Sequence, residues 1–359
     1  MSNSTNVNNV IATLLGQVDE EKLIKITTDS GAPIGNFEKI KDIANNIDEN
    51  SNDIRASWKD VRVQHTDYFD SLNPGNLVLS VFGKDYKFSG NGITALCNLL
   101  TIPTQYVKKC MAQGNFGLAC LNLNTWIDKM PQDKEMLLRT TNSRLFGIVS
   151  NKYTIFDDSE VLDVVEGILG PQNNYSIKDY SISPELMKLR IVSRDKIIIN
   201  GEELSFGFDV KNSRVGRSSV SIDVLIYRAI CSNGMIFGGS KGMMYTKRHV
   251  AIERGSLVTE FTEMLDQAPD TIEFIKKHIE ESQLSVAKAG VITSLLSKFK
   301  TENIPKNALI RLEQSISENS NVTLWDFANQ VTSMAQEYSI ETRERMEVFA
   351  GKIILNQIA

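Results

Sequence analysis

Two segments in the middle of the chain alternate between apolar and polar residues. In residues 204–210, alternate positions are strongly apolar and the positions between them are small or polar. Residues 219–227 repeat this pattern except at Leu225. Because successive side chains of a strand point to opposite faces, we expect two strands with one face in a core and the other face open. The apolar faces are Leu204, Phe206, Phe208 and Val210 in the first segment, and Val220, Ile222, Val224 and Ile226 in the second.

Further strands are predicted around these two. Asn200 and Gly201 indicate a tight turn, since both residue types tolerate the left-handed backbone conformation. Residues 77–90 and 136–150 each predict a β-hairpin, and the second turns at Asn142 and Ser143. The strands expected in the main sheet cover residues 175–182, 187–194, 197–200, 204–210 and 218–230.

Helical periodicity appears on both sides of the strand region. Ile40, Ile43, Ala44 and Ile47 share one helix face, and the polar residues up to Asp53 predict a solvated linker. Asp157 and Glu160 predict a capping box ahead of a helix. Further helices are expected over residues 93–100, 103–111, 116–127 and 161–169, and through most of the chain after Arg254.

Together these elements predict an α+β fold. Its centre is an antiparallel, half-exposed curved sheet, with a helical cluster before it and a helical C-terminal region after it. We expect N-terminal helices and a small hairpin in residues 1–90, an α+β core with the basic sheet in 91–254, and the helical region in 255–359.

Composition points to ordinary globular material, with 42% hydrophobic and 23% charged residues among 359. No apolar run approaches the roughly 20 residues that a membrane span needs, and residues 1–9 do not read as a targeting signal. Cys97, Cys110, Cys120 and Cys231 form no Cys-x-x-Cys pair, which disfavours a zinc site. We expect a cytoplasmic protein with free thiols and no cofactor.

Charge is distributed unevenly along the chain. Residues 188–254 contain twelve basic side chains and six carboxylates, a net charge of +6, whereas the whole chain carries −5, which leaves −11 for the remainder. A basic island in an acidic chain is typical of a surface that binds a polyanion. The loop KNSRVGRSS at 211–219 supplies forked and hydroxyl donors that suit phosphate oxygens.

The basic residues of the expected sheet and its loops, with an aromatic residue among them, are the candidate nucleic-acid contacts. Such a mixture favours single strands, because unpaired bases are free to stack on aromatic rings. The alternative is a solvated sheet face with aromatic residues in the core. The candidates are Lys188, Arg190, Arg194, Lys211, Arg214, Arg217, Tyr227, Arg228, Lys241, Lys247 and Arg248.

Catalytic motifs are not evident. The glycine-rich segment 233–244 fails the phosphate-loop spacing, because Lys241 follows Gly239 and Ser240 one place too late. Asp157 and Asp158 fit helix capping better than metal binding. Asp209 and Asp223 fall on the polar strand face, which keeps a metal-dependent nuclease open as the least favoured alternative.

Several segments resemble the phage/plasmid-like family long classed as a domain of unknown function. Where that family often has an acidic residue or histidine after the loop asparagine, this chain has Ser213 and Arg214, so the loop is more basic. The order of helix, hairpins and helix is also similar to the core of phage single-strand annealing proteins. The segments with the resemblance are GITALCNLLTIPTQYVKKC (92–110), LNLNTWI (121–127), LLRTTNSRLFGIVSNKYTIFDDSEVLDVV (137–165), NSRVGRSSVSIDVLIYRAICSNGMI (212–236) and TLWDFANQVTSMAQEYSIETRERMEVFAGKIIL (323–355).

From these observations we expect a homo-oligomer in a bacterial host that binds single-stranded DNA without sequence preference and anneals it. The expected mechanism is electrostatic: arginines neutralise phosphates while the bases stay free to pair. The main alternative is a phage protein-interaction module, either a host-defence antagonist or a virion-associated protein, whose acidic helical tail docks a partner.

Overall fold

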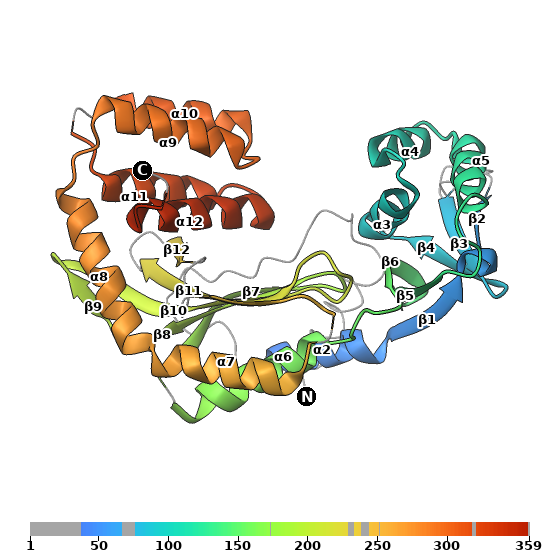
Figure 1. Cartoon of the computed structure of the whole chain (residues 1–359), viewed down its shortest axis with the longest axis horizontal. Coiled ribbons are helices and arrows are strands. Elements are labelled where there is room, and N and C mark those ends of the chain that lie inside the picture. The colour runs from blue at the N-terminus through green and yellow to red at the C-terminus, as the bar shows by residue number, and fades with distance from the viewer. Residues whose placement is uncertain are drawn as a thin grey trace, which may run out of the picture.

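The computed structural model describes residues 37–66, 76–172, 174–228, 233–237, 244–250, 252–317 and 321–357. Within these ranges the chain forms eleven α-helices and two β-sheets, which confirms the α+β class. Two lobes lie side by side, each built around one sheet (Figure 1). The predicted Lys241 lies outside the described residues.

The first lobe packs three helices against a six-stranded sheet. Its strand order is β1-β5-β6-β4-β3-β2, with one parallel pair, β4 and β6. This sheet takes strands from both sides of the boundary that we expected near residue 90. The elements are β1 (Ser51–Ser57), the 3-10 turn η1 (Trp58–Asp60), β2 (Val61–Thr66), β3 (Asn76–Val81), β4 (Lys84–Phe88), α3 (Gly90–Leu100), α4 (Thr104–Ala112), α5 (Phe116–Ile127), β5 (Glu135–Thr141) and β6 (Arg144–Ser150).

The second lobe surrounds a seven-stranded antiparallel sheet with helices. The order is β12-β11-β10-β8-β7, with β13 also pairing β11 and β9 also pairing β10. The elements are α2 (Phe37–Glu49), α6 (Asp158–Leu169), η2 (Gly170–Gln172), β7 (Tyr175–Ile182), β8 (Met187–Ser193), β9 (Ile197–Ile199), β10 (Glu202–Asn212), β11 (Val220–Arg228), β12 (Asn233–Phe237), β13 (Met244–Lys247), α7 (Arg254–Asp266), α8 (Ala268–Leu284), α9 (Ala289–Thr301), α10 (Lys306–Ser317), α11 (Leu324–Ala335) and α12 (Ile340–Ile354).

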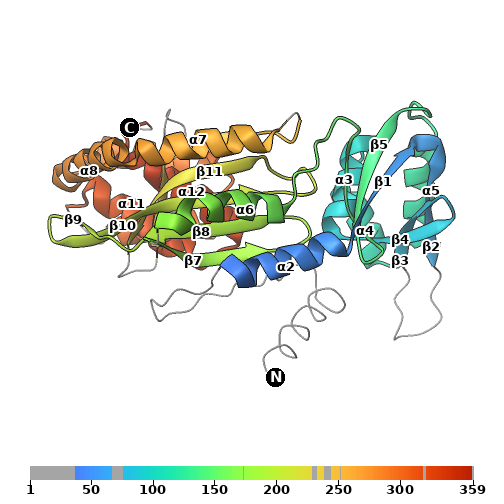
Figure 2. The same cartoon turned by 90° about the horizontal axis from the view of Figure 1, so that it is seen from below.

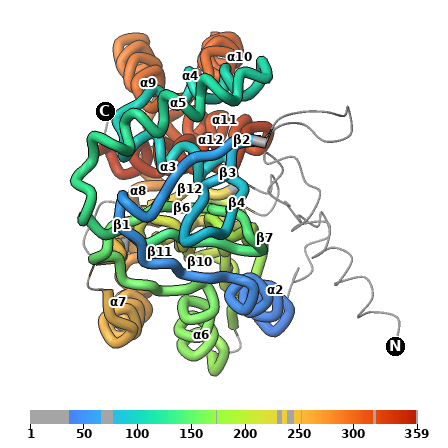
Figure 3. The backbone as a smooth tube through the Cα atoms, turned by 90° about the vertical axis from the view of Figure 1, so that its right-hand side faces the viewer, coloured from blue at the N-terminus to red at the C-terminus, as the bar shows by residue number. Residues whose placement is uncertain are grey.

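Helices cover both sides of this second sheet. Helices α2, α6 and α7 run across its lower side (Figures 1 and 2), and α11 and α12 lie above it with α9 and α10 outermost (Figures 1 and 3). The apolar faces predicted for β10 and β11 are confirmed, since all eight of their residues belong to the main hydrophobic core. The strand period of two therefore located this core correctly.

Turn chemistry was also predicted correctly at two hairpins. Asn142 and Ser143 have φ of 49° and 59°, and Asn200 and Gly201 have φ of 48° and 84°. Both pairs adopt the left-handed conformation that a two-residue hairpin requires.

The linker expected after the first helix was wrong. Residues 51–57 form β1, which pairs along its whole length with β5. Its pattern of exposure is irregular, so alternation did not reveal it. Helix α10 falls within the helical region expected over residues 255–359, although no helix was delimited there. None of the helices in the described ranges is both long and apolar enough to cross a membrane.

Candidate functional site

The polar face of the second sheet, which we expected to be open, is covered along much of its length by α12. Val348 packs against a small cluster on that face, which includes Leu225 and Tyr227. At Gly351 an added Cβ would collide with the backbone carbonyl of Ile236, so helix and strand are in direct backbone contact. The cations that α12 covers are therefore interior groups. These contacts do not support the half-exposed sheet that we expected from the sequence.

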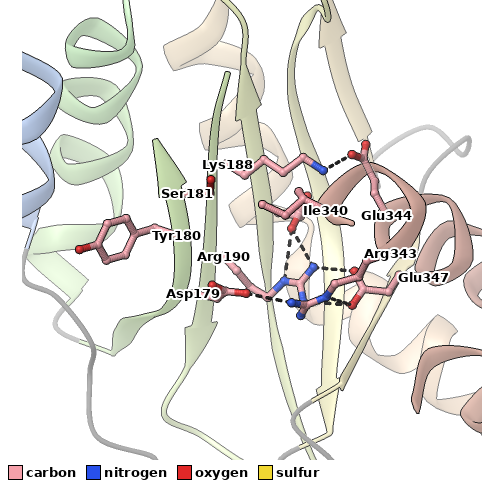
Figure 4. A pocket seen from close by; sticks show the side chains of 10 residues that line it. Asp179, Tyr180, Ser181, Lys188, Arg190, Ile340, Arg343, Glu344 and Glu347 are labelled. Carbon is pink, nitrogen blue, oxygen red and sulfur yellow. Dashed lines mark hydrogen bonds and ion pairs between the residues drawn. The ribbon is translucent and has the colours of Figure 1, made fainter. Parts of the chain in front are cut away.

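Arg190 lies at the centre of an ionic cluster between the sheet and α12. Its guanidinium donates to Asp209 Oδ1 at 3.2 Å and to Glu347 Oε2 at 2.7 Å. From the helix, Arg343 donates to Glu347 Oε1 at 2.9 Å and to Asp179 Oδ2 at 3.1 Å. Figure 4 shows these side chains converging from β7, β8 and α12, whereas Tyr180 points to the other side of the sheet.

Glu344 binds two of the predicted lysines at once. Both Lys188 and Lys211 donate to its carboxylate. Burial disfavours the charged form of Glu344, but the two ammonium groups outweigh burial and lower its pKa. The cavity among these residues has a volume of ≈ 40 Å³, enough for water but too small for a nucleobase.

Carboxylates match cations across this interface. Four cationic side chains face four carboxylates in mutual contact, so this group of eight side chains carries no excess positive charge. Asp223 lies opposite Asp209 in the β10–β11 register, and burial together with Asp209 raises its pKa to about 7. The matched groups are Lys188, Arg190, Lys211 and Arg343 with Asp179, Asp209, Glu344 and Glu347.

The basic loop after β10 joins the two lobes. Arg214 is 2% exposed and pairs with Asp48 Oδ1 at 2.7 Å and with Asp157 Oδ1 at 3.2 Å. From β5 of the first lobe, Arg139 donates to the Arg214 carbonyl at 2.6 Å and to Asp157 and Asp53 at 2.9 and 2.7 Å. This loop was expected to hold phosphates, and it instead holds protein carboxylates.

Close backbone packing reinforces the same junction. A Cβ added at Gly147 of β6 would lie 2.5 Å from Cβ of Val215, so only glycine allows the loop to approach. Beyond the loop, Arg217 pairs with Glu185 at 2.6 Å and with Glu341 at the start of α12. The loop thus contacts the first sheet, the β7–β8 connection and the C-terminal helix.

The predicted capping box was only partly correct. Asp157 is the N-cap residue of α6, but its side chain makes no cap hydrogen bond. Its carboxylate is drawn to Arg139 and Arg214, which lower its pKa although burial opposes them. A charged partner from a distant segment thus displaced the local interaction that the sequence favoured.

The remaining predicted site residues lie in different environments and do not form one group. Arg228 pairs with Glu202 at 2.9 Å, and Tyr227 is buried. Arg194 and Arg248 are exposed and Lys247 is half-buried, and none of the three has an ion pair among the described residues. The expected single basic surface is therefore not assembled by the residues that were predicted to form it.

A different surface combines exposed aromatic rings with lysines. On α5, Trp126 is 45% exposed, and Leu118 and Leu121 are 48% and 65% exposed. Tyr106 of α4, 41% exposed, accepts a hydrogen bond from Asn122 Nδ2 at 2.9 Å, which fixes its ring beside α5. We call Tyr106, Lys109, Leu118, Leu121, Trp126 and Lys129 the α4–α5 surface.

Positive charge accompanies these rings. Lys129 Nζ lies 4.5 Å from the centroid of the Trp126 ring, a cation–π distance. Lys109 follows Tyr106 by three residues on α4 and is exposed, so both occupy one side of the helix. The nearby carboxylates of Asp128 and Asp133 are engaged by Arg62 at 2.7 Å and Lys59 at 2.8 Å.

We did not predict this surface from the sequence, although the number of apolar residues in α5 indicated it. On α5, Ala119, Leu123 and Ile127 recur at intervals of four and are buried, so they account for the core-facing side. Leu118, Leu121 and Trp126 lie outside that stripe. A short helix with more apolar residues than its core face needs indicates an exposed apolar surface.

Metal ligation has no support in the described part of the chain, where no group of three or more acidic, histidine or cysteine side chains could hold an ion. A comparison with models of protein families matched none of them to this chain, and comparisons with curated protein sequences and with solved structures found no match either.

Proposed function

We propose that the protein binds single-stranded DNA without sequence preference through the α4–α5 surface. The observation that supports this most is the exposed Trp126 ring with Lys129 over it, together with the Tyr106 ring, which is hydrogen-bonded to Asn122 one helical turn before Trp126. Exposed aromatic rings stack on unpaired bases of any sequence, and neighbouring lysines neutralise the backbone phosphates. Annealing by a homo-oligomer, in keeping with the resemblance to single-strand annealing proteins, is part of this proposal.

The rigidity of the surface favours this role. Helices α4 and α5 pack on the first-lobe core through Val107, Leu123 and Ile127, so their outer side chains are presented on fixed backbones. Because the rings are exposed before binding, DNA would not have to displace packed protein groups. The sheet face lacks this property, since its cations already contact carboxylates of α12.

Fluorescence anisotropy with a labelled single-stranded oligonucleotide tests the proposal. We expect Trp126→Ala to weaken binding by about 1–3 kcal/mol, the value of one base stacked on an aromatic ring. Replacing Lys109 and Lys129 by alanine should reduce the slope of log K against log salt by roughly 0.7 per lysine. Replacing Lys300 and Lys306, exposed lysines of the other lobe, provides the matched control.

Comparing these variants shows whether DNA binds at the α4–α5 surface or at lysines of the other lobe. Equal losses in the α4–α5 variant and in the control variant would contradict the assignment of the site, as would unchanged affinity in Trp126→Ala. An oligoribonucleotide of the same sequence, run in parallel, shows whether the sugar matters. Native mass measured on the same samples reports whether binding and annealing require an oligomer.

A second candidate function is protein interaction, favoured by Leu118 and Leu121. These two leucines are exposed three residues apart on α5, so they are neighbours on the helix surface, and they contribute nothing to phosphate binding. Exposed contiguous apolar side chains are typical of protein interfaces. Loss of partner binding in Leu121→Asp, with single-stranded DNA affinity absent in the wild-type protein, would favour this function over the first.

A further inference from the structure

The charge matching between the second sheet and α12 stops before the end of the sheet. Along β10, Lys211, Asp209 and Ser205 share the polar face, and the first two contact Glu344 and Arg190. On α12 the corresponding side chains change from carboxylates to Val348 and Gly351. Beyond that point the helix brings no carboxylate over the sheet.

Two lysines converge on this uncompensated end. Lys178 Nζ lies 5.3 Å from the centroid of the Tyr227 ring. Lys196 Nζ lies 3.1 Å from Ser205 Oγ, and Ser205 is directly opposite Tyr227 in the β10–β11 register. The two ammonium groups thus extend over neighbouring residues, although Lys178 comes from the middle of β7 and Lys196 from the connection between β8 and β9.

Neither lysine forms an ion pair with a carboxylate in the described part of the chain. Glu203, which shares the polar face of β10, forms no ion pair either. Residues 229–232, Ala-Ile-Cys-Ser, follow β11 in the chain and include no acidic residue. All four cations closer to the start of α12 have a carboxylate partner, so this pair is an exception on the face.

The lack of a counter-charge is unfavourable for Lys178, which is half-buried, whereas Lys196 is exposed. Val192, Leu225 and Tyr227 form a buried cluster beside the two lysines, and Ser205 is 1% exposed. Burial and the neighbouring Lys196 lower the pKa of Lys178, as expected for a partly buried cation close to a second cation. An anion between the two ammonium groups would relieve their repulsion.

We propose that Lys178 and Lys196 form a binding site for a single phosphate-type oxyanion. Each ammonium group offers three donors, and Ser205 orients Lys196 by accepting one of them. A dianion matches the two positive charges, and the Tyr227 ring and its apolar neighbours lower the local dielectric constant, which strengthens the attraction. The site is separate from the α4–α5 surface and does not depend on the DNA binding proposed above.

Thermal unfolding in inorganic phosphate, compared with chloride at equal pH and ionic strength, tests the site. We expect phosphate to raise the unfolding midpoint of the wild-type protein, because a ligand that binds only the folded state stabilises it. Lys178→Met and Lys196→Met should each lose this response, while Lys306→Met on α10 should keep it. In chloride, Lys178→Met should unfold at a higher midpoint than the wild type, since it removes an uncompensated charge.

The same variants distinguish the possible sources of the oxyanion. If the ligand is a backbone phosphate of DNA, Lys178→Met lowers both the phosphate response and the salt slope of oligonucleotide binding. If it is a free phosphate compound, only the phosphate response is lost. Trp126→Ala should keep the phosphate response in either case. A wild-type midpoint that phosphate does not change, or an equal response in all variants, would overturn the site.

Discussion

Arg190 of β8 and Glu347 of α12 form an ion pair 2.7 Å long between side chains that are 8% and 0% exposed. Glu347 also binds Arg343 of its own helix at 2.9 Å. One buried carboxylate therefore compensates two buried guanidinium groups. This arrangement fixes the C-terminal helix on the sheet and explains why Arg190 contributes nothing to a basic surface.

Replacing Glu347 by alanine should destabilise the fold strongly. The change leaves Arg190 and Arg343 buried without their shared partner, and breaking a buried pair in this way typically costs about 3–5 kcal/mol. Chemical denaturation measures the free energy of unfolding. The control is Glu337→Ala, which removes an exposed surface pair with Arg311 and should change the free energy of unfolding far less. Similar losses in the two variants would contradict this account.

Arg214→Ala and Arg217→Ala should behave differently although both residues lie in the same loop. Arg214 is buried against Asp48 and Asp157, so its loss should cost about 3–5 kcal/mol. The Arg217 side chain is 33% exposed, and its loss should cost roughly 1 kcal/mol. Neither change should alter the salt slope of DNA binding in the folded protein. An altered slope in either variant would return the loop to the DNA-binding surface.

Stability should fall as the pH rises through neutrality, in part because of Asp158. Burial raises the pKa of this fully buried carboxyl to about 7, against about 3.9 in an unfolded chain. The protonated form is thus preferred in the folded state, and its contribution is complete below about pH 4 and is lost as the pH passes 7. Asp223 shifts in the same direction for a similar reason.

Asp158→Asn tests this pH dependence. The amide keeps an oxygen for the hydrogen bond that Asn212 Nδ2 donates to Asp158 Oδ1 at 2.7 Å, and it cannot ionise. We expect the difference in unfolding free energy between pH 5 and pH 8 to shrink by a few kcal/mol at most. The control is Asp85→Asn on the exposed side of β4, which should leave the difference unchanged. An unchanged pH dependence in Asp158→Asn would exclude this residue as its source.

The local pattern of apolar, polar and turn-forming residues was sufficient to predict much of the fold. The alternation of apolar and polar residues located the buried faces of β10 and β11, because their core residues, such as Phe206 and Phe208, are two positions apart in the sequence. Turn residues such as Asn142 located hairpins, since few residues accept positive φ. β1 escaped detection because its pairing with β5 comes from a distant segment, and residues such as Asn52 and Asp53 have no strand periodicity.

The site was harder to predict than the fold for a physical reason. A run of arginines in the sequence shows positive charge but not the partner that neutralises it. Arg190 is matched by Glu347, 157 residues away, and Arg214 by Asp48 of α2, which also lies far away in the sequence. Exposure of Trp126 is likewise a tertiary property, because the same residue on another face of α5 would be core.

Intrinsic tryptophan fluorescence during titration with an unlabelled single-stranded oligonucleotide tests the central claim most directly. Trp58 and Trp325 are 2% and 4% exposed, whereas Trp126 is 45% exposed, so a stacking base can reach only Trp126 among the three tryptophans. We predict salt-sensitive quenching that disappears in Trp126→Phe. Absence of quenching at low salt, or oligonucleotide binding by anisotropy with unchanged fluorescence, would contradict DNA binding at the α4–α5 surface.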